Sequence, residues 1–209
     1  SESSLILEVF TLHHGRTALV AKGVKRPTSA FRPVLLPLQP LQLAFGGDSE
    51  IRTLKSAEWQ GGYTMPAGDA LMSGYYVNEL VLNLLARDDP HPRLFGHYAQ
   101  TVHMISGEHG ALLQAALRSF ELLLLREVGL LPQLSAQTLT YADLEPLESY
   151  ALVPEAGLRL AGEYDKYHLL GAQWQALEAG LNDAAPFSAL LGLCGDGIPG
   201  LKQQLRQML

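Results

Sequence analysis

The chain has 209 residues, 47% of them hydrophobic and 17% charged, and its formal net charge is −6. This composition is typical of a soluble globular protein rather than a disordered one, and no apolar run reaches the roughly 18 residues of a membrane-spanning helix. Cys194 is the only cysteine, which excludes an intramolecular disulfide and a multi-cysteine zinc site and favours a reducing cytoplasm, with the thiol buried.

The first quarter of the chain has the two-residue alternation of β-strands. Apolar and polar side chains alternate along it, and glycine and proline punctuate the intervening segments. We expect a fifth strand before residue 1 and strands at residues 4–11, 16–22, 34–45 and 50–59. Pro37 and Pro40 predict a bend or bulge in the third of these four. Short, bent strands favour a small closed barrel of the OB-fold or the SH3-like type, and periodicity alone does not choose between them.

From Pro66 onward the apolar residues recur with the 3.6-residue period of helices. We expect an irregular region at 133–166 with short strand-like pieces, and helices at residues 67–89, 92–104, 111–129, 167–182 and 198–209. The 111–129 segment is apolar around most of its circumference and keeps only a narrow polar edge. It therefore forms the centre of the core, and Gly129 ends it as a left-handed C-cap.

The sequence thus predicts an α+β fold, with an N-terminal OB-fold (a small β-barrel) at residues 1–62 followed by a mostly α-helical domain at residues 63–209. The charge is divided in a similar way. Residues 1–62 hold seven Lys or Arg and five acids, a balance of +2, whereas the remaining residues hold eight and sixteen, a balance of −8. A polyanion would therefore meet the N-terminal domain.

Motifs for catalysis or metal binding are missing from the sequence. Four histidines, at positions 91, 97, 103 and 109, recur every six residues, a spacing that sends neighbours to different faces of a helix. The three- or four-residue spacing of zinc ligands does not occur, nor does a nucleophile elbow, a phosphate-binding glycine loop or a dinucleotide fingerprint. We therefore expect no metal, no cofactor and no enzymatic turnover.

Nucleic-acid binding has more support. A small barrel with basic loops and interleaved aromatic residues is a common architecture for contacting single strands, because cations follow the phosphates and ring faces stack on bases. The segment at 23–33 is the most basic loop of the chain, and Phe31, Trp59 and Tyr63 are candidate stacking residues. The candidate phosphate contacts are Arg16, Lys22, Lys25, Arg26, Arg32, Arg52 and Lys55.

Several segments resemble a known family. The run from Glu2 to Thr11, followed by Gly15-Arg16 and Ala21-Lys22-Gly23, is similar to the opening of the RecO family of bacterial recombination mediator proteins. The resemblance continues in order and spacing to residue 131, through residues 52–58, 75–80, 90–95 and 117–129, the last of which carries an LR-x-FE-x-x-LL-x-x-x-G pattern.

This resemblance implies an OB-fold, a helical domain and an activity without turnover. Members bind single- and double-stranded DNA, anneal complementary strands and, with RecR, help RecA to displace single-strand-binding protein during gap repair. The helical domain docks the acidic, phenylalanine-ended tail of single-strand-binding protein, and Arg118 and Arg126 would suit that tail by contacts with its carboxylates. The expected location is cytoplasmic, at the nucleoid, without membrane contact.

The chain departs from the family pattern in three places. Some members carry a four-cysteine zinc module after the central helix, the 23–33 loop is shorter than the family implies, and the C-terminal region resembles the family poorly. Two alternatives also stay open. One is a protein-interaction scaffold with weak or no DNA binding, and the other is a metal-independent hydrolase that uses Asp or His groups of the 133–166 region.

Overall fold

The computed structural model describes residues 3–62, 64–107, 110–195 and 197–209. Contacts between residues divide the chain into two compact units, Ser1–Gly107 and Glu108–Leu209. The boundary predicted after residue 62 marks a different division, because it falls inside the first unit where strands give way to helices. The α+β class is confirmed, with a β-rich segment first and helices after it.

The first unit begins with a four-stranded sheet of β1 (Leu5–Thr11), β2 (Gly15–Ala21), β3 (Leu41–Gly46) and β4 (Ile51–Trp59), in the order β1-β2-β4-β3. β2 and β4 run parallel, and they join the antiparallel pairs β1/β2 and β3/β4. This arrangement fits the predicted OB-fold. The strand expected before residue 1 lies outside the described residues.

Alternation of side chains explains why one face of this sheet is buried. Leu19, Ala21 and Leu54 form the centre of a cluster, and Leu7, Val9, Leu43 and Phe45 pack against it from the neighbouring strands. The adjacent residues point to the opposite face, which leaves Ile6 and Lys55 exposed. The strand predictions are therefore confirmed in place and period, except that residues 34–40 are turns.

Those turns have a physical cause. Pro37 and Pro40 cannot donate to a strand ladder, and Leu38 between them adopts a left-handed conformation with φ of 60°. The Leu38 side chain is buried against Gly74 of the first helix, where even a Cβ would collide with it at 2.3 Å. The segment is thus held by packing instead of by strand pairing.

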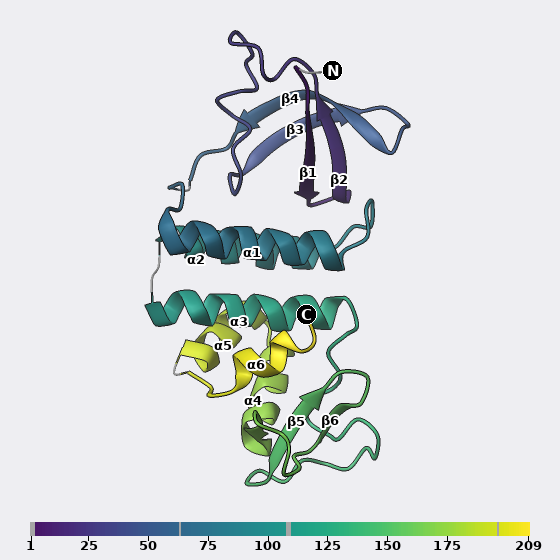
Figure 1. Ribbon diagram of the computed structural model, residues 1–209, viewed down its shortest axis with the longest axis vertical. Coiled ribbons are helices and arrows are strands. Elements are labelled where there is room, and N and C mark those ends of the chain that lie inside the picture. Colours follow the sequence, from purple (N-terminus) through teal and green to yellow (C-terminus); the bar gives the residue numbers. More distant parts are fainter. Residues whose placement is uncertain (1–2, 63, 108–109, 196) are drawn as a thin grey trace. The chain divides into compact units, whose positions relative to one another are not determined.

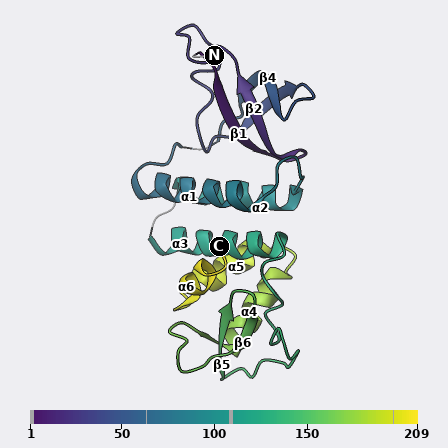
Figure 2. The ribbon, with the colours of Figure 1, turned by 45° about the vertical axis from the view of Figure 1, so that its right-hand side comes forward.

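Two helices, α1 (Gly68–Leu84) and α2 (Pro92–Gly107), complete the first unit and form a hairpin on one side of the sheet (Figures 1 and 2). α1 ends five residues before the predicted end at 89. The chain there turns to meet the sheet: the Asp88 amide donates to the Arg16 carbonyl at 2.8 Å, and Asp88 has φ of 57°. This tertiary hydrogen bond replaces the next turn of helix.

The second unit is built on α3 (Gly110–Glu127), which matches the predicted central helix and ends at Gly129 with φ of 76°. α4 (Gly171–Leu181), α5 (Pro186–Gly195) and α6 (Leu201–Arg206) lie on one side of it, and a small sheet of β5 (Ser149–Val153), β6 (Gly157–Leu160) and β7 (Leu169–Leu170) stands beside α4 (Figure 1). The strand-like pieces of the 133–166 region are thus a hairpin.

The second unit differs from the predictions in four details. α5 was not predicted at all, because its run of Ala, Leu and Gly residues resembles a buried loop as much as a helix. α4 begins four residues later than expected, since residues 169–170 pair with β5, and α6 is shorter. Part of the polar edge of α3 is buried: Arg118, Ser119 and Glu121 are shielded from solvent, whereas Gln114 and Glu127 are exposed.

Candidate functional site

Five of the seven candidate cations form an exposed group on the first unit. They are Lys22, Lys25, Arg26, Arg32 and Lys55. No acidic residue occurs in the sequence between Glu8 and Asp48. Within the part of the chain that the structure describes, none of the five makes an ion pair with an acid. Four of them belong to the β2–β3 connection, so this group is a concentrated source of positive potential.

The loop that carries these cations is anchored from beneath. Val24 is buried in the sheet cluster, and Phe31 packs against the same cluster. Successive backbone hydrogen bonds give the loop its turns, among them Arg26 N to Gly23 O at 3.0 Å and Ser29 N to Arg26 O at 3.0 Å. Apolar residues thus point inward and fix the loop, while its charged residues are held in solvent.

The fifth cation, Lys55, extends the group onto the sheet. β2 and β4 pair in parallel, with Ala18 opposite Ile51 and Val20 opposite Thr53. Lys55 is exposed where β4 bulges opposite Ala44 and Phe45, and its Nζ lies over Gly46 of β3, 3.0 Å from where a Cβ would stand.

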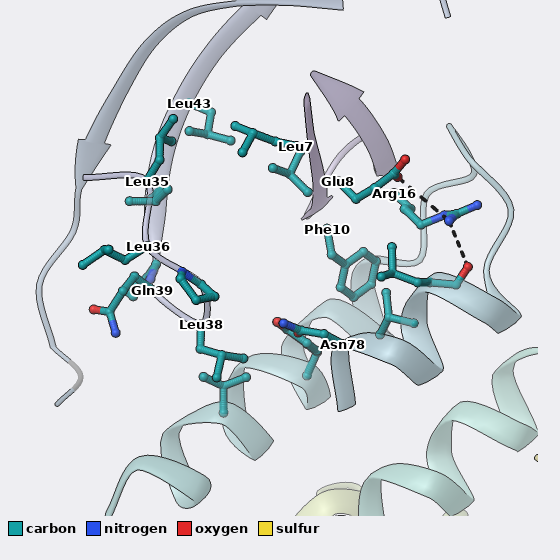
Figure 3. A pocket seen from close by; sticks show the side chains of 18 of the residues that line it. Leu7, Glu8, Phe10, Arg16, Leu35, Leu36, Leu38, Gln39, Leu43 and Asn78 are labelled. Carbon is teal, nitrogen blue, oxygen red and sulfur yellow. Dashed lines mark hydrogen bonds and ion pairs between the residues drawn. The ribbon is translucent and has the colours of Figure 1, made fainter. Parts of the chain in front are cut away.

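The other two candidates, Arg16 and Arg52, have protein partners. Arg16 donates to the Leu82 carbonyl of α1 at 2.9 Å and lies 3.9 Å from Glu8, as the dashed lines of Figure 3 show. Arg52 lies 3.1 Å from Asp88 and its guanidinium stacks 5.9 Å from the Phe45 ring. Both are half-buried and both connect the sheet to the helical hairpin.

Arg87 completes this junction, which the sequence analysis did not foresee. It pairs with both Glu8 of β1 and Glu50 at the start of β4. These contacts raise the pKa of the exposed Arg87 guanidinium, chiefly through the hydrogen bond to Glu8. The proximity of Asp88 to a basic strand depends on tertiary structure, for which the sequence carries no local signal.

Beneath the sheet lies an apolar groove of about 570 Å³. Figure 3 shows Leu7, Leu35 and Leu43 converging on it from β1, the 34–40 turns and β3, with Phe10 and Asn78 on the side of the helices. The Phe10 ring makes edge contacts at 5.5 Å with both Phe95 and Tyr98 of α2. Burial raises the pKa of the Tyr98 hydroxyl, which donates to Asn78 at 2.6 Å.

The candidate stacking residues differ in their availability. Phe31 is half-buried in the sheet cluster, whereas the Trp59 side chain at the end of β4 is 57% exposed and donates from Nε1 to Gln39 at 3.0 Å. Tyr63 lies outside the described residues. Trp59 is therefore an exposed ring at this end of the sheet.

The two arginines predicted to meet a partner peptide are engaged within the second unit. Arg118 is 8% exposed and pairs with the buried Glu121 on the same helix. Arg126 forms two hydrogen bonds with the Glu178 carboxylate of α4, at 2.7 and 3.1 Å, and a third with the Pro132 carbonyl. The structure does not test either residue as a peptide contact, but a peptide would have to displace these partners.

Groups for nucleophilic or metal chemistry are not assembled in the described residues. Within residues 3–62, 64–107, 110–195 and 197–209, no three His, Cys, Asp or Glu side chains are grouped so as to hold a metal ion, and His109 lies outside these ranges. Cys194 is buried, as predicted, and desolvation raises the pKa of its thiol to about 11. A thiol with this pKa stays protonated and is a poor nucleophile. Among the described helices none is long and apolar enough to cross a membrane.

Known proteins resemble the chain along its whole length. The family model described as "Recombination protein O N terminal" matches residues 1–63, and "Recombination protein O C terminal" matches residues 65–173. The DNA repair protein RecO of Albidiferax ferrireducens is 65% identical over 100% of this chain and 83% of its own length. Those of Polaromonas sp. and Variovorax paradoxus are 61% and 62% identical, over 100% of this chain and 84% and 82% of theirs.

Proposed function

Because the chain belongs to the RecO family of DNA repair proteins, we propose that it is a DNA-binding recombination mediator. It binds single- and double-stranded DNA through the first unit, anneals complementary strands and, with RecR, helps RecA to load on DNA coated by single-strand-binding protein. The observation that supports this proposal best is the group of five exposed cations on the loop after β2 and on β4.

The proposed mechanism of these residues is electrostatic. Lys and Arg side chains neutralise phosphates and release the counterions condensed on DNA, so affinity falls steeply as the salt concentration rises. Strands whose phosphates are neutralised repel each other less, which favours annealing. None of these steps makes or breaks a covalent bond.

Arg16 and Arg52 have a different role in this proposal. Each is committed to an acid at the junction between sheet and helices, so its charge is already balanced. We assign DNA contact to the five exposed cations and assign the two paired arginines to holding the sheet on the α1–α2 hairpin. A phosphate would gain little from a guanidinium that must first leave its carboxylate.

Fluorescence anisotropy of a labelled single-stranded oligonucleotide, titrated at several salt concentrations, tests the proposal. The triple variant Lys25→Ala, Arg26→Ala, Arg32→Ala removes three loop cations. Its slope of log affinity against log salt should be shallower by about two, since each phosphate contact on a single strand contributes about 0.7.

A second triple variant serves as the matched control. Arg93→Ala, Lys202→Ala and Arg206→Ala remove the same charge from exposed positions outside the four strands and the β2–β3 loop. The slope of this variant should equal that of the unmodified protein. An equal decrease of the salt slope in both variants would show that DNA affinity depends on overall charge and not on the loop. Absence of binding at low salt would refute DNA contact altogether.

We further propose that the second unit docks the acidic tail of single-strand-binding protein. Arg126 is the more accessible of the two candidate arginines, because its side chain is 32% exposed whereas that of Arg118 is 9% exposed. A tail carboxylate that reaches Arg126 must take the place of Glu178. This exchange keeps one carboxylate on the guanidinium throughout, which limits its cost.

The alternative is a protein-interaction scaffold with little DNA affinity of its own. It is favoured by the charge of −8 on residues 63–209. This alternative predicts weak oligonucleotide binding even at low salt, with a salt slope that the loop substitutions do not change. The anisotropy titration therefore separates the two functions.

A further inference from the structure

A surface at one end of the first unit combines exposed apolar side chains with acidic charge. Its apolar members are here called the rim patch and are Leu36, Trp59, Met65, Met72 and Tyr75, with exposed fractions of 49%, 57%, 39%, 65% and 43%. Trp, Tyr and Met are enriched in protein interfaces and depleted from ordinary surfaces. This composition marks the rim patch as an interaction surface.

Contacts through Gln39 and Leu38 link the members of the rim patch. The Gln39 side chain accepts from Trp59 Nε1 at 3.0 Å and lies 3.7 Å from the Met65 sulfur. The preceding Leu38 packs on Gly74, the neighbour of Tyr75. Figure 3 shows Leu36, Leu38 and Gln39 together at one side of the groove. Three segments far apart in sequence therefore meet at this place.

The α1 part of the rim patch lies on a single helix face. Met72, Tyr75 and Glu79 are spaced by three and four residues, which brings them to neighbouring positions along the outer side of α1. All three side chains are exposed, and the opposite side of α1 is buried through Ala70 and Val77. The rim patch therefore includes an exposed face of α1 as well as the Trp59 ring.

Charge identifies the chemistry of the partner. Residues 56–86 contain no Lys or Arg and three acids, Glu58, Asp69 and Glu79, all of which are exposed. The cations that flank this stretch in the sequence are Lys55 and Arg87, and Arg87 is paired with two acids. A surface of this sign repels phosphates, so it is unsuited to DNA. Its complement is an apolar surface ringed by Lys or Arg.

We propose that the rim patch docks a protein partner whose contact surface is an apolar helix or ridge flanked by Lys and Arg. The Trp59 ring is the anchor of this interface, because its hydrogen bond to Gln39 fixes it in one orientation before binding and reduces the entropy lost. The interface is independent of DNA binding, since it shares no residue with the five exposed cations. The protein thereby holds DNA and a cationic partner on separate surfaces of one unit.

Intrinsic fluorescence provides a direct readout. The chain has two tryptophans, and Trp174 is fully buried, so a change of solvent exposure on binding reports on Trp59. The probe is a 15-residue amphipathic peptide with leucine on one face and Lys and Arg on its flanks. Binding of this peptide should move the Trp59 emission to shorter wavelength and protect the ring from acrylamide quenching. The same peptide with Glu in place of its cations should leave both unchanged.

Two sets of variants locate the interface. Met72→Ser with Tyr75→Ser should weaken binding of the cationic peptide about tenfold, because apolar anchors contribute most of the affinity. A triple variant should reverse the charge preference, so that the peptide with Glu binds and the cationic peptide does not; its changes are Glu58→Lys, Asp69→Lys and Glu79→Lys. The matched control, Glu145→Lys, Glu148→Lys and Glu155→Lys, changes the same charge at exposed positions of the second unit and should keep the cationic preference.

Three results would overturn the proposal. Equal binding by the patch variants and the control would show general attraction between opposite charges. Binding weaker than about 1 mM for the unmodified chain would show that the surface has no specific affinity. Concentration-dependent dimerisation in sedimentation velocity, abolished by Met72→Ser with Tyr75→Ser, would assign the patch to a second copy of this chain.

Discussion

Arg52 on β4 and Asp88 in the α1–α2 turn form an ion pair in which Nη1 lies 3.1 Å from Oδ1. The same oxygen accepts a hydrogen bond from the Thr17 hydroxyl at 3.1 Å. One carboxylate therefore joins two strands to the helical hairpin. An isolated surface pair contributes little to stability, but this one holds a turn whose backbone has no other regular structure.

Replacing Asp88 should loosen this junction. Asp88→Ala removes the ion pair, the Thr17 contact and a residue type that tolerates φ of 57°. The free energy of unfolding should therefore fall by about 1–2 kcal/mol. Asp88→Asn keeps a carbonyl acceptor and the left-handed tolerance and should cost about half as much. Urea denaturation at neutral pH measures both. Asp89→Ala is the control, and an equal loss in all three variants would contradict the role assigned to Asp88.

The pairing of Arg52 also predicts which β4 cation matters for DNA. Arg52→Ala and Lys55→Ala remove the same charge from one strand, three residues apart. Lys55 is exposed and has no acid partner among the described residues, so its loss should reduce the salt slope of affinity for the single-stranded oligonucleotide by about 0.7. Arg52→Ala should leave the slope unchanged and lower stability instead. An equal change of slope in both variants would show that Arg52 exchanges Asp88 for phosphate.

Local patterns explain how much of this first unit was predictable. Strands β1, β2 and β4 follow from alternation in their own sequences, and the break before β3 follows from Pro37 and Pro40. The end of α1 was not predictable in the same way, because the residues at 85–89 are compatible with helix. Their hydrogen bonds to β2, some 70 residues earlier in the chain, determine where the helix ends.

Contacts between distant segments also explain which part of the candidate site was not predictable. The sequence predicts seven cations of equal standing, and the structure separates them into five exposed and two paired because the acids that pair with Arg16 and Arg52 come from distant segments. The burial of Arg118 and Glu121 was likewise not predictable from the sequence, because an arginine and a glutamate three residues apart are typical of an exposed pair on a helix. The sequence shows which residues are charged, but which charges pair with each other depends on the tertiary structure.

Gly15 offers a steric test of the contact between the β1–β2 turn and the residues after α1. It has φ of 64°, and a Cβ at this position would lie 1.9 Å from the Asp89 carbonyl oxygen. Gly15→Ala should therefore cost about 3 kcal/mol or more, since the clash involves backbone on both sides. Gly61→Ala is the matched control, because its φ is 75° with open space around it and only the conformational cost of about 1 kcal/mol applies. Equal losses of stability would show that the turn moves freely.

Glu178 should make the second unit sensitive to acid. Burial alone would raise the pKa of its carboxyl, but hydrogen bonds from Arg126, the Leu134 amide and Asn182 outweigh burial and lower the pKa below its ordinary value. A carboxyl with a depressed folded-state pKa stabilises the protein above the unfolded pKa, near 4.3, and this stabilisation disappears as pH falls through the folded pKa.

Glu178→Gln should therefore destabilise the protein by about 2 kcal/mol at neutral pH, and the difference from the unmodified chain should shrink below about pH 4.3. Urea denaturation between pH 7 and pH 3 measures it. Glu148→Gln removes an exposed carboxyl of the same unit as a control. A difference that stays constant over this range would show that hydrogen-bonding geometry, and not ionisation, accounts for the effect.

Arg118 allows a structural role to be separated from peptide binding. Arg118→Ala leaves the buried Glu121 carboxylate without its arginine, which should cost about 3–5 kcal/mol. The double variant Arg118→Met, Glu121→Gln removes both charges from the interior and should recover most of that loss, because a buried pair replaced by neutral groups of similar size is often tolerated. Since Arg118 is 8% exposed, we expect a synthetic acidic tail peptide ending in phenylalanine to bind the double variant with unchanged affinity. If the double variant is as stable as the unmodified chain in urea but no longer binds the peptide, Arg118 contacts the tail directly and must leave the interior to do so.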